Sequence, residues 1–276
     1  MSYPIGRKVW EKNILMAKKE SAWAGFPEVC QGMGQQSLWR THSDAVNNAL
    51  LTRWWPKGQF ENLLKTDLFD EAVSDGLSPL LNTRAKKVFY IDASFEVHQM
   101  AKRRHPPLRT IGADVRYLPF ANDTFDGIVS NSTLDHFESP DDLVASLKEL
   151  YRVLQPGAQM ILTLDNLANP VIFLRNGLPF RLLQQLKIVP FYVGVTLGPH
   201  RLQHLLEEIG FKVLEVDAIM HCPRVLAVAV ARWIQKYSKL KIQEHYLRFL
   251  QDFECLSHLP TRFFTGYFVA VRVIRP

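Results

Sequence analysis

Three aspartates in this sequence are evenly spaced, and each of them follows a short apolar run. Asp70, Asp92 and Asp114 stand 22 residues apart. A carboxylate can accept charge-assisted hydrogen bonds from two neighbouring hydroxyl groups or from an amino group. In an open α/β sheet, ligands bind at the carboxyl ends of the strands. The spacing therefore predicts three successive strand–helix units whose acidic ends face a polar ligand.

Small residues follow the first of these aspartates. The segment from Asp70 to Gly76 has the pattern acidic-x-small-x-small-x-Gly, with Ala72 and Ser74 at the small positions. Small side chains allow the backbone to turn sharply and to approach a ligand closely. We therefore count this segment among the candidate binding residues. Further candidates at the ends of the predicted strands are Ala93, Val115, Ser130 and Asn131.

The elements that would position these residues begin at Leu63. From there, short apolar runs alternate with helical stretches, which is typical of βαβ units and a parallel sheet. The last predicted strand alternates with a period of two, as a half-buried strand does. The predicted strands are Leu63–Phe69, Lys87–Ile91, Arg109–Ala113, Phe125–Ser130, Gln159–Leu164, Phe211–Met220 and Tyr267–Ile274.

Helix signals lie between the strands. Ser139 is a favourable N-cap with Pro140 in the first turn, and this helix must stop at Gln155-Pro156-Gly157. A second helix is predicted from Pro199 to Ile209, ending at Gly210. The sequence predicts an N-terminal helical cap over residues 1–60, which holds five of the six tryptophans, and a main domain over 61–276. Within that domain, insertions are predicted at 166–198 and, in helical form, at 223–260.

Taken in order, these motifs resemble the series in class I S-adenosylmethionine (SAM)-dependent methyltransferases of the Rossmann-like superfamily, type 11-like. The resemblance extends from about Leu63 to Leu164 and includes the segment Arg152–Gly157. It implies an α/β fold with a seven-stranded, mostly parallel sheet, helices on both faces and an antiparallel last strand. It also implies SAM as the cofactor. Ala72 and Ser74 depart from the family pattern because they stand at positions that are usually glycine.

The resemblance implies roles for the candidates. Asp92, with Ala93 beside it, would accept hydrogen bonds from the two ribose hydroxyls of SAM. Asp114 would accept from the adenine amino group, and the Val115 N–H would face a ring nitrogen. The segment Asp70–Gly76 would lie against the methionine and ribose parts. Ser130 and Asn131 would complete the cofactor-binding set.

His136 lies just beyond the fourth predicted strand, near the expected position of the transferred methyl group. A histidine with an ordinary pKa of ~6.5 suits proton removal at neutral pH, so His136 is the candidate catalytic base. The alternative is that it packs against the cofactor or caps the next helix. No metal site is predicted, since His200 and His204 stand four apart but have no third ligand in view.

Composition restricts the cellular setting and the partners. The chain has a net charge of +6, with 47% hydrophobic and 22% charged residues, as expected for a globular domain. We expect a reducing, cytoplasmic setting, because the three cysteines are far apart and no signal peptide is evident. The apolar stretch Val171–Val195 is interrupted by charges, so no transmembrane segment is predicted and peripheral membrane contact stays open. The cysteines are Cys30, Cys222 and Cys255, and the exposed helix end Lys102-Arg103-Arg104 is the densest basic cluster.

The substrate class follows mainly from what the sequence lacks. After the fourth strand stands Asn131-Ser132-Thr133-Leu134, where an adenine-N6 methyltransferase would have Asp/Asn-Pro-Pro-aromatic, and no cysteine nucleophile is near. Nucleic acid is therefore an unfavoured partner, and a small or amphiphilic metabolite is the predicted acceptor of in-line methyl transfer. Two alternatives stay open: a weak or inactive methyltransferase-like binding protein, and a nucleic-acid or protein methyltransferase. The oligomeric state is not predicted.

Overall fold

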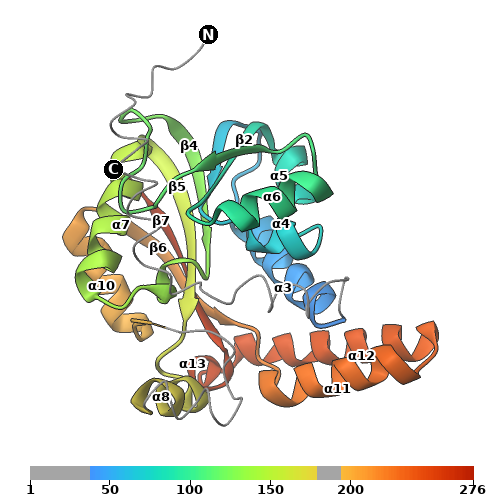
Figure 1. The fold of residues 1–276 in the computed structure, drawn as a ribbon. Coiled ribbons are helices and arrows are strands. Elements are labelled where there is room, and N and C mark those ends of the chain that lie inside the picture. Colours follow the sequence, from blue (N-terminus) through green and yellow to red (C-terminus); the bar gives the residue numbers. More distant parts are fainter. Residues whose placement is uncertain (1–37, 179–193) are drawn as a thin grey trace.

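The computed structural model describes residues 38–178 and 194–276 of the chain. Within these ranges, the strands form one seven-stranded sheet in the order β3-β2-β1-β4-β5-β7-β6 (Figure 1). Strands β1 to β5 pair in parallel, and β7 is antiparallel to both β5 and β6. The predicted fold class is confirmed. The strands are β1 Phe60–Lys65, β2 Ala85–Asp92, β3 Arg109–Gly112, β4 Phe125–Asn131, β5 Leu154–Asp165, β6 Lys212–Ile219 and β7 Phe268–Ile274.

The first strand differs from its predicted range Leu63–Phe69 at both ends. It begins at Phe60 and ends at Lys65, and the following segment forms the short helix α4, Phe69–Val73. The apolar pair Leu68-Phe69 suggested a continuing strand. However, the backbone N–H groups of Ala72 and Ser74 bond to carbonyls four residues earlier, as in a helical turn. The motif Asp70–Gly76 therefore lies on and just after α4, and not directly at the end of the strand.

The fifth strand begins five residues earlier than predicted. Helix α7, Pro140–Val153, stops just before the Gln155-Pro156-Gly157 segment, as predicted. That segment then belongs to the start of β5, where the register against β4 shifts between Phe125 and Gly127. Ser139 caps α7 by accepting a hydrogen bond from the Asp141 N–H, and the left-handed Gly210 (φ +115°) ends α10, both as predicted.

Helices cover both faces of the sheet. Successive strand residues alternate between two hydrophobic clusters: Leu63 belongs to one and Leu64 to the other. The first cluster includes residues of α3, α4, α5, α6, α11 and α12, and the second includes residues of α7 and α10. The remaining helices are α3 Leu38–Trp54, α5 Ser78–Arg84, α6 Phe95–Arg104, α8 Pro170–Gly177, α10 Pro199–Ile209, α11 Arg224–Tyr237, α12 Leu240–Asp252, α13 Arg262–Thr265, and the 3₁₀ turns η1 Leu134–His136 and η2 Phe253–His258.

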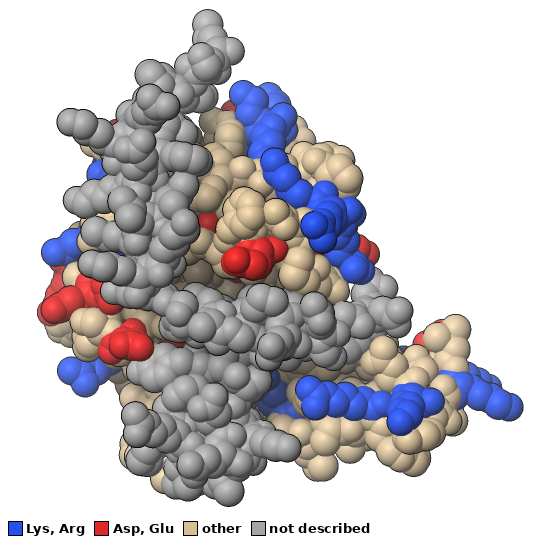
Figure 2. Space-filling model, viewed as in Figure 1, with Lys and Arg blue, Asp and Glu red and all other residues tan. Residues whose placement is uncertain are grey.

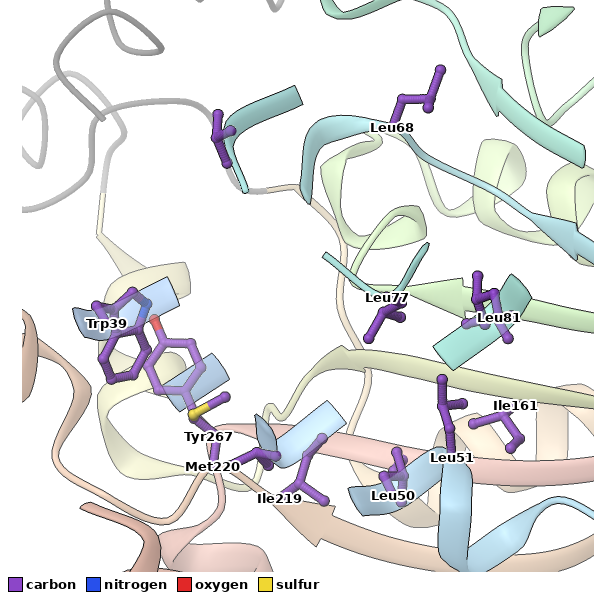
Figure 3. Packing of buried hydrophobic residues seen from close by; sticks show 14 of the residues in the cluster. Trp39, Leu50, Leu51, Leu68, Leu77, Leu81, Ile161, Ile219, Met220 and Tyr267 are labelled. Atoms are coloured by element: carbon purple, nitrogen blue, oxygen red, sulfur yellow. The ribbon is translucent and has the colours of Figure 1, made fainter. Parts of the chain in front are cut away.

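Helix α3 is the described part of the predicted N-terminal cap. Its Leu50 and Leu51 lie close to Ile161 of β5 (Figure 3). Trp39 and Trp54 are buried in the same cluster as Leu63 of β1, so these tryptophans pack the core. The division at residue 60 stays a prediction, because residues 1–37 lie outside the described ranges. The predicted insertion 166–198 also stays a prediction, because its residues 179–193 are not described.

The other insertion is helical, as predicted, and contains α11, α12 and η2. Lys102, Arg103 and Arg104 form the exposed last turn of α6, also as predicted. Among the described helices, none is both long and apolar enough to cross a bilayer.

Removing buried volume from α3 tests whether this helix is part of the main core. We expect Leu51→Ala to lower the free energy of unfolding by ~2–5 kcal/mol, because a 2% exposed leucine would leave a cavity. Urea denaturation measures this. The neighbouring exposed residue provides the control, since Thr52→Ala should change stability by less than ~0.5 kcal/mol. Equal effects of both variants would show that α3 packs only loosely on the sheet.

Candidate functional site

The carboxyl ends of the parallel strands meet at one edge of the sheet, and a buried cation stands at the centre of that edge. Lys65, the last residue of β1, is fully buried. Its Nζ donates to Glu71 Oε2 at 2.8 Å, to Asp67 Oδ1 at 3.0 Å and to the Asp67 carbonyl at 3.1 Å. The ammonium group thus binds both sides of the segment that follows β1. This cluster was not predicted from the sequence, although a lysine inside an apolar strand indicates a buried charge that needs a partner.

Burial and charge act in opposite directions on this cluster. Burial by itself would lower the pKa of Lys65, but the carboxylates of Asp67 and Glu71 raise it above its usual value. Burial likewise raises the pKa of Glu71, and the Lys65 ammonium opposes that shift. Each charge is therefore tolerated in the interior because of the other.

Glu71 also fixes the end of the loop. Its Oε1 accepts a hydrogen bond from the Leu77 N–H at 3.1 Å. Gly76 beside it has φ +56°, and a Cβ at this position would lie 2.6 Å from Glu71 Oε1. Glycine is thus required here both by the left-handed backbone and by the close approach of the glutamate.

The other residues of the first motif contact protein atoms. The Ser74 hydroxyl lies 3.1 Å from Asp44 Oδ2 and 2.9 Å from the Asp70 carbonyl, and it accepts from the Gly76 N–H at 3.1 Å. Asp70 forms an ion pair with Arg40 of α3. Ala72 is buried in the first cluster. These contacts replace a glycine-rich loop with a short helix held by side chains.

Asp92 ends β2 beside this loop. Its Oδ2 accepts from the Leu68 N–H at 3.1 Å and its Oδ1 from the Ser94 N–H at 2.8 Å. Burial raises the pKa of Asp92 to about 6. Each carboxylate oxygen has a second lone pair, so Asp92 can accept two more hydrogen bonds while it stays anchored. Ala93 next to it is exposed.

Asp114 is engaged by an arginine that the sequence analysis did not single out. Arg116 contacts both carboxylate oxygens of Asp114, with Nη2 at 2.7 Å from Oδ2, and its Nη1 donates to Asp142 at 3.0 Å. The hydrogen bonds that Arg116 donates to Asp114 and Asp142 raise the pKa of Arg116. An amino group that approached Asp114 would therefore meet a carboxylate already paired with a guanidinium. Val115 is buried.

Hydroxyl groups tie the end of β4 to the loop after β1. Thr66 Oγ1 donates to the buried Ser130 hydroxyl at 3.0 Å, and it lies 2.9 Å from Thr133 Oγ1. Thr133 in turn contacts Asp67 Oδ2 at 3.2 Å. The lysine cluster and the β4 end thus form one polar network.

Asn131 links β4 to β5 and to α4. Its Oδ1 accepts from Thr163 Oγ1 at 2.8 Å, and its Nδ2 lies 3.4 Å from Asp70 Oδ2. A small cavity of about 10 Å³ lies next to Asn131 and has space for about one water molecule. It is lined by Asn131, Ser130 and Thr163 together with apolar residues of α3.

His136 lies in η1, beside a second polar cluster. Its Nε2 is 3.8 Å from Oδ1 of the buried Asp135, and its side chain is 22% exposed. Asp135 Oδ2 accepts from the Ser132 hydroxyl and from the Asp165 N–H, both at 2.9 Å. The Asp135 carboxylate therefore lies beside the His136 imidazole, slightly beyond hydrogen-bond distance.

Asp165 at the end of β5 completes this cluster. Arg175 of α8 donates from Nη2 to Asp165 Oδ2 at 2.6 Å and from Nη1 to the Tyr267 hydroxyl at 3.2 Å. Burial raises the pKa of Asp165, and the charge of Asp135 adds to the shift. Asp165 was not predicted as a site residue, although it is an acidic residue at a strand end, as Asp92 is.

The structure brings the predicted site residues to one edge, in the strand order β3-β2-β1-β4. Asp92 joins the β1 loop through Leu68, and Asn131 joins it through Asp70. Asp114 follows β3, whose Gly112 pairs with Asp92. The individual cofactor-binding and catalytic roles stay predictions.

The lysine cluster predicts a specific pattern of stability. Lys65→Met should lower the free energy of unfolding by ~3–5 kcal/mol, because the Glu71 carboxylate then stays buried without its partner. The loss should shrink as pH falls, since protonation of Glu71 removes the uncompensated charge. Denaturant unfolding at several pH values measures both effects. In the control, Lys65→Met with Glu71→Gln should recover most of the loss; no recovery would mean that the methylenes of Lys65 matter more than its charge.

The comparisons with known proteins agree with this geometry. Residues 73–162 match the model of a methyltransferase domain family. A demethylmenaquinone methyltransferase from Streptomyces avermitilis is 32% identical over 96 residues, which are 34% of this chain and 40% of that protein. The chain thus matches less than half the length of this curated relative.

Solved structures share the fold at low sequence identity. A SAM-dependent methyltransferase from Thermotoga maritima has a TM-score of 0.54 at 15% identity, covering 87% of this chain and 92% of the other. A complex of the Haloferax volcanii Trm112 methyltransferase activator with a methyltransferase gives 0.56 at 15% identity, covering 92% and 95%. The sheet order and these structural likenesses show that the chain has the class I, Rossmann-like methyltransferase fold, and residues 73–162 of it match the methyltransferase domain family.

Proposed function

We propose that this protein is a SAM-dependent methyltransferase that transfers a methyl group in line to a small or amphiphilic metabolite. The observation that carries the proposal is Asp92, a carboxylate held at the carboxyl end of β2 although burial raises its pKa to about 6. A partly buried carboxylate that costs free energy and keeps unused lone pairs is suited to binding a ligand. The family match over residues 73–162 supports the same conclusion.

The residues at the sheet edge fit the parts of SAM. Asp92 accepts from the two ribose hydroxyls while the Leu68 and Ser94 N–H groups hold its carboxylate in place. Asp114 accepts from the adenine amino group, and its pairing with Arg116 fixes the direction of its lone pairs. The sulfonium of bound SAM supplies an activated methyl group. The main work of this chain is then to position the acceptor and to exclude water.

His136 and Asp135 fit the acceptor side. The imidazole can take a proton from an acceptor hydroxyl, and the Asp135 carboxylate at 3.8 Å can orient the ring and stabilise its protonated form. Such contacts are often long in the free enzyme and shorten when the substrate binds. Asp135 acts through His136 and is therefore a positioning residue.

The proposed class of methyl acceptor is based on the residues near the end of β5. Helix α8 starts five residues after β5 ends, and its Val171, Phe173 and Leu174 are exposed. Apolar side chains beside a polar cluster suit an acceptor with a polar head and an apolar body. The match to a demethylmenaquinone methyltransferase, though limited to 96 residues, supports an amphiphilic acceptor.

One observation keeps the binding-protein alternative in view. The loop after β1 is held by the buried Lys65–Glu71 pair in place of a glycine-rich turn. If this loop blocks the methionine part of SAM, the protein would bind the cofactor weakly or not at all. Calorimetry with SAM and S-adenosylhomocysteine separates the two functions. A nucleic-acid or protein acceptor would instead show itself by strongly salt-dependent RNA binding or by methylation of a protein.

The Asp92 assignment predicts both a loss of affinity and a pH dependence. Asp92→Ala should weaken the binding of S-adenosylhomocysteine at least tenfold, because two hydrogen bonds to a charged acceptor are removed. In the wild type, affinity should fall as pH drops through about 6, since the protonated carboxyl is a poorer acceptor. Calorimetry over this pH range measures both.

Two variants control this experiment. Asp92→Asn should bind weakly without the fall below pH 6, which assigns the titration to this carboxyl. Asp252→Ala changes an exposed aspartate at the end of α12 and should bind as the wild type does. Unchanged affinity in a folded Asp92→Ala protein would refute the assignment.

The His136 assignment predicts a loss of rate without a loss of cofactor affinity. His136→Gln should lower kcat by ~10²–10⁴ with phenolic or hydroquinone acceptors and leave S-adenosylhomocysteine affinity within about twofold. Asp135→Asn should lower kcat less and shift the acidic limb of the pH–rate profile. Methyl transfer from labelled SAM to a panel of such acceptors measures these effects. Full activity of His136→Gln would show that the acceptor loses its proton elsewhere.

A further inference from the structure

The hairpin formed by α11 and α12 has one covered side and one open side. It extends away from the sheet as a pair of helices (Figure 1). Ala227, Ala231 and Ile234 of α11 and Leu250 of α12 are buried in the first hydrophobic cluster, where α3 contacts both helices. Because α3 covers one side, the exposed residues of the hairpin lie on the other.

The open side of α11 carries an apolar stripe. Leu226, Ala229, Trp233 and Tyr237 follow each other at intervals of three or four residues, so they share one helix face. Leu226, Trp233 and Tyr237 are each more than 60% exposed. The rings of Trp233 and Tyr237 lie 6.0 Å apart. On α12, Phe249 is also exposed.

Basic residues surround this stripe. Residues 224–252 contain six lysines and arginines but only two acidic residues, and α11 has no acidic residue at all. Lys236 Nζ lies 5.1 Å above the ring of Tyr237. Figure 2 shows blue side chains gathered along the hairpin with almost no red among them. The exposed basic residues are Arg232, Lys236, Lys239, Lys241 and Arg248.

The charges indicate which partner this surface fits. A second copy of the chain would bring two basic faces together, and these repel each other. Protein interfaces are depleted in lysine, whereas this surface is rich in it. Aromatic and aliphatic side chains flanked by Lys and Arg are typical of helices that lie in the interface of an anionic bilayer.

The apolar surface continues toward the candidate site. Asn169 Nδ2 at the start of α8 donates to the Phe264 and Thr265 carbonyls of α13 at 3.2 Å. The Thr265 hydroxyl lies 2.7 Å from His221 Nδ1, three residues before α11. Exposed Phe264 and the exposed residues of α8 thus lie between the hairpin and the end of β5.

We propose that the hairpin surface, made of Leu226, Arg232, Trp233, Lys236, Tyr237, Lys241, Arg248 and Phe249, binds the surface of an anionic lipid bilayer. The aromatic and aliphatic side chains enter the headgroup region, and the basic side chains contact lipid phosphates. This docking would place the β5 edge next to the bilayer, where an amphiphilic acceptor could enter. That last step rests on the proposed function, whereas bilayer binding itself does not.

Flotation of the full chain with lipid vesicles tests the proposal. We expect binding to phosphatidylcholine vesicles that contain phosphatidylglycerol, weaker binding to phosphatidylcholine alone, and a loss of binding as salt is raised. Trp233→Gln with Tyr237→Gln should weaken binding at least about tenfold, because the aromatic anchors are removed. Arg232→Glu with Lys236→Glu should weaken it by a similar factor through charge alone. The aromatic pair is thus altered without a change in charge, and circular dichroism verifies the fold of each variant.

A matched control reverses charges on another exposed helix end: Lys102→Glu with Arg103→Glu on α6 should bind vesicles as the wild type does. The proposal is overturned if the hairpin variants bind like the wild type, or if the wild type ignores anionic vesicles. A concentration-dependent dimer that Trp233→Gln with Tyr237→Gln disrupts would instead identify a second copy as the partner. Calorimetry with S-adenosylhomocysteine on the same variants should show unchanged affinity, so that a failure of cofactor binding is recognised separately.

Discussion

The ion pair between Lys65 and Glu71 fixes the loop on which the candidate site depends. An ammonium group cannot stay buried at the end of an apolar strand without partners, because desolvation costs several kcal/mol. The partners are Asp67 and Glu71, which lie within the next six residues. The chain must therefore turn back immediately after β1. This requirement ends the strand at Lys65 and favours the short helix α4 that carries Glu71.

Several neighbours follow from that turn. The Leu68 N–H faces Asp92, which anchors the carboxylate at the end of β2. Glu71 approaches Gly76 so closely that no side chain fits there. The Lys65–Glu71 ion pair thus sets the backbone path of this loop, a role that glycines have in a glycine-rich turn. If SAM binds here as we propose, it meets a loop that is already ordered.

Burial on both faces of the sheet explains why polar groups gather at its edge. Leu63 and Leu64 face different hydrophobic clusters, as neighbouring residues in the other central strands do, so neither face can accept a charge without partners. Hydroxyls and carboxylates therefore collect where the strands end. There Thr66 contacts both Ser130 and Thr133, and the Asp135–Asp165 cluster forms beside them. The α11–α12 hairpin differs, because α3 covers only one of its sides.

The sequence by itself determined the class of fold and the position of most strands. It could do so because apolar periodicity and helix caps such as Ser139 and Gly210 act locally. Aspartates at strand ends also followed from the order of the motifs, since Asp92 and Asp114 stand where a βα unit must place them.

Only the tertiary structure decided which atoms those residues meet. The apolar pair Leu68-Phe69 predicts a continuing strand. The helical turn that forms there depends on the ion pair between buried Lys65 and Glu71, which the local sequence pattern does not indicate. Arg116 holds Asp114, and Arg175 of α8 holds Asp165, through contacts that join separate elements. The open stripe of α11 has the periodicity of any amphipathic helix. Which side faces water depends on where α3 packs, and packing between distant segments is not encoded in spacing alone.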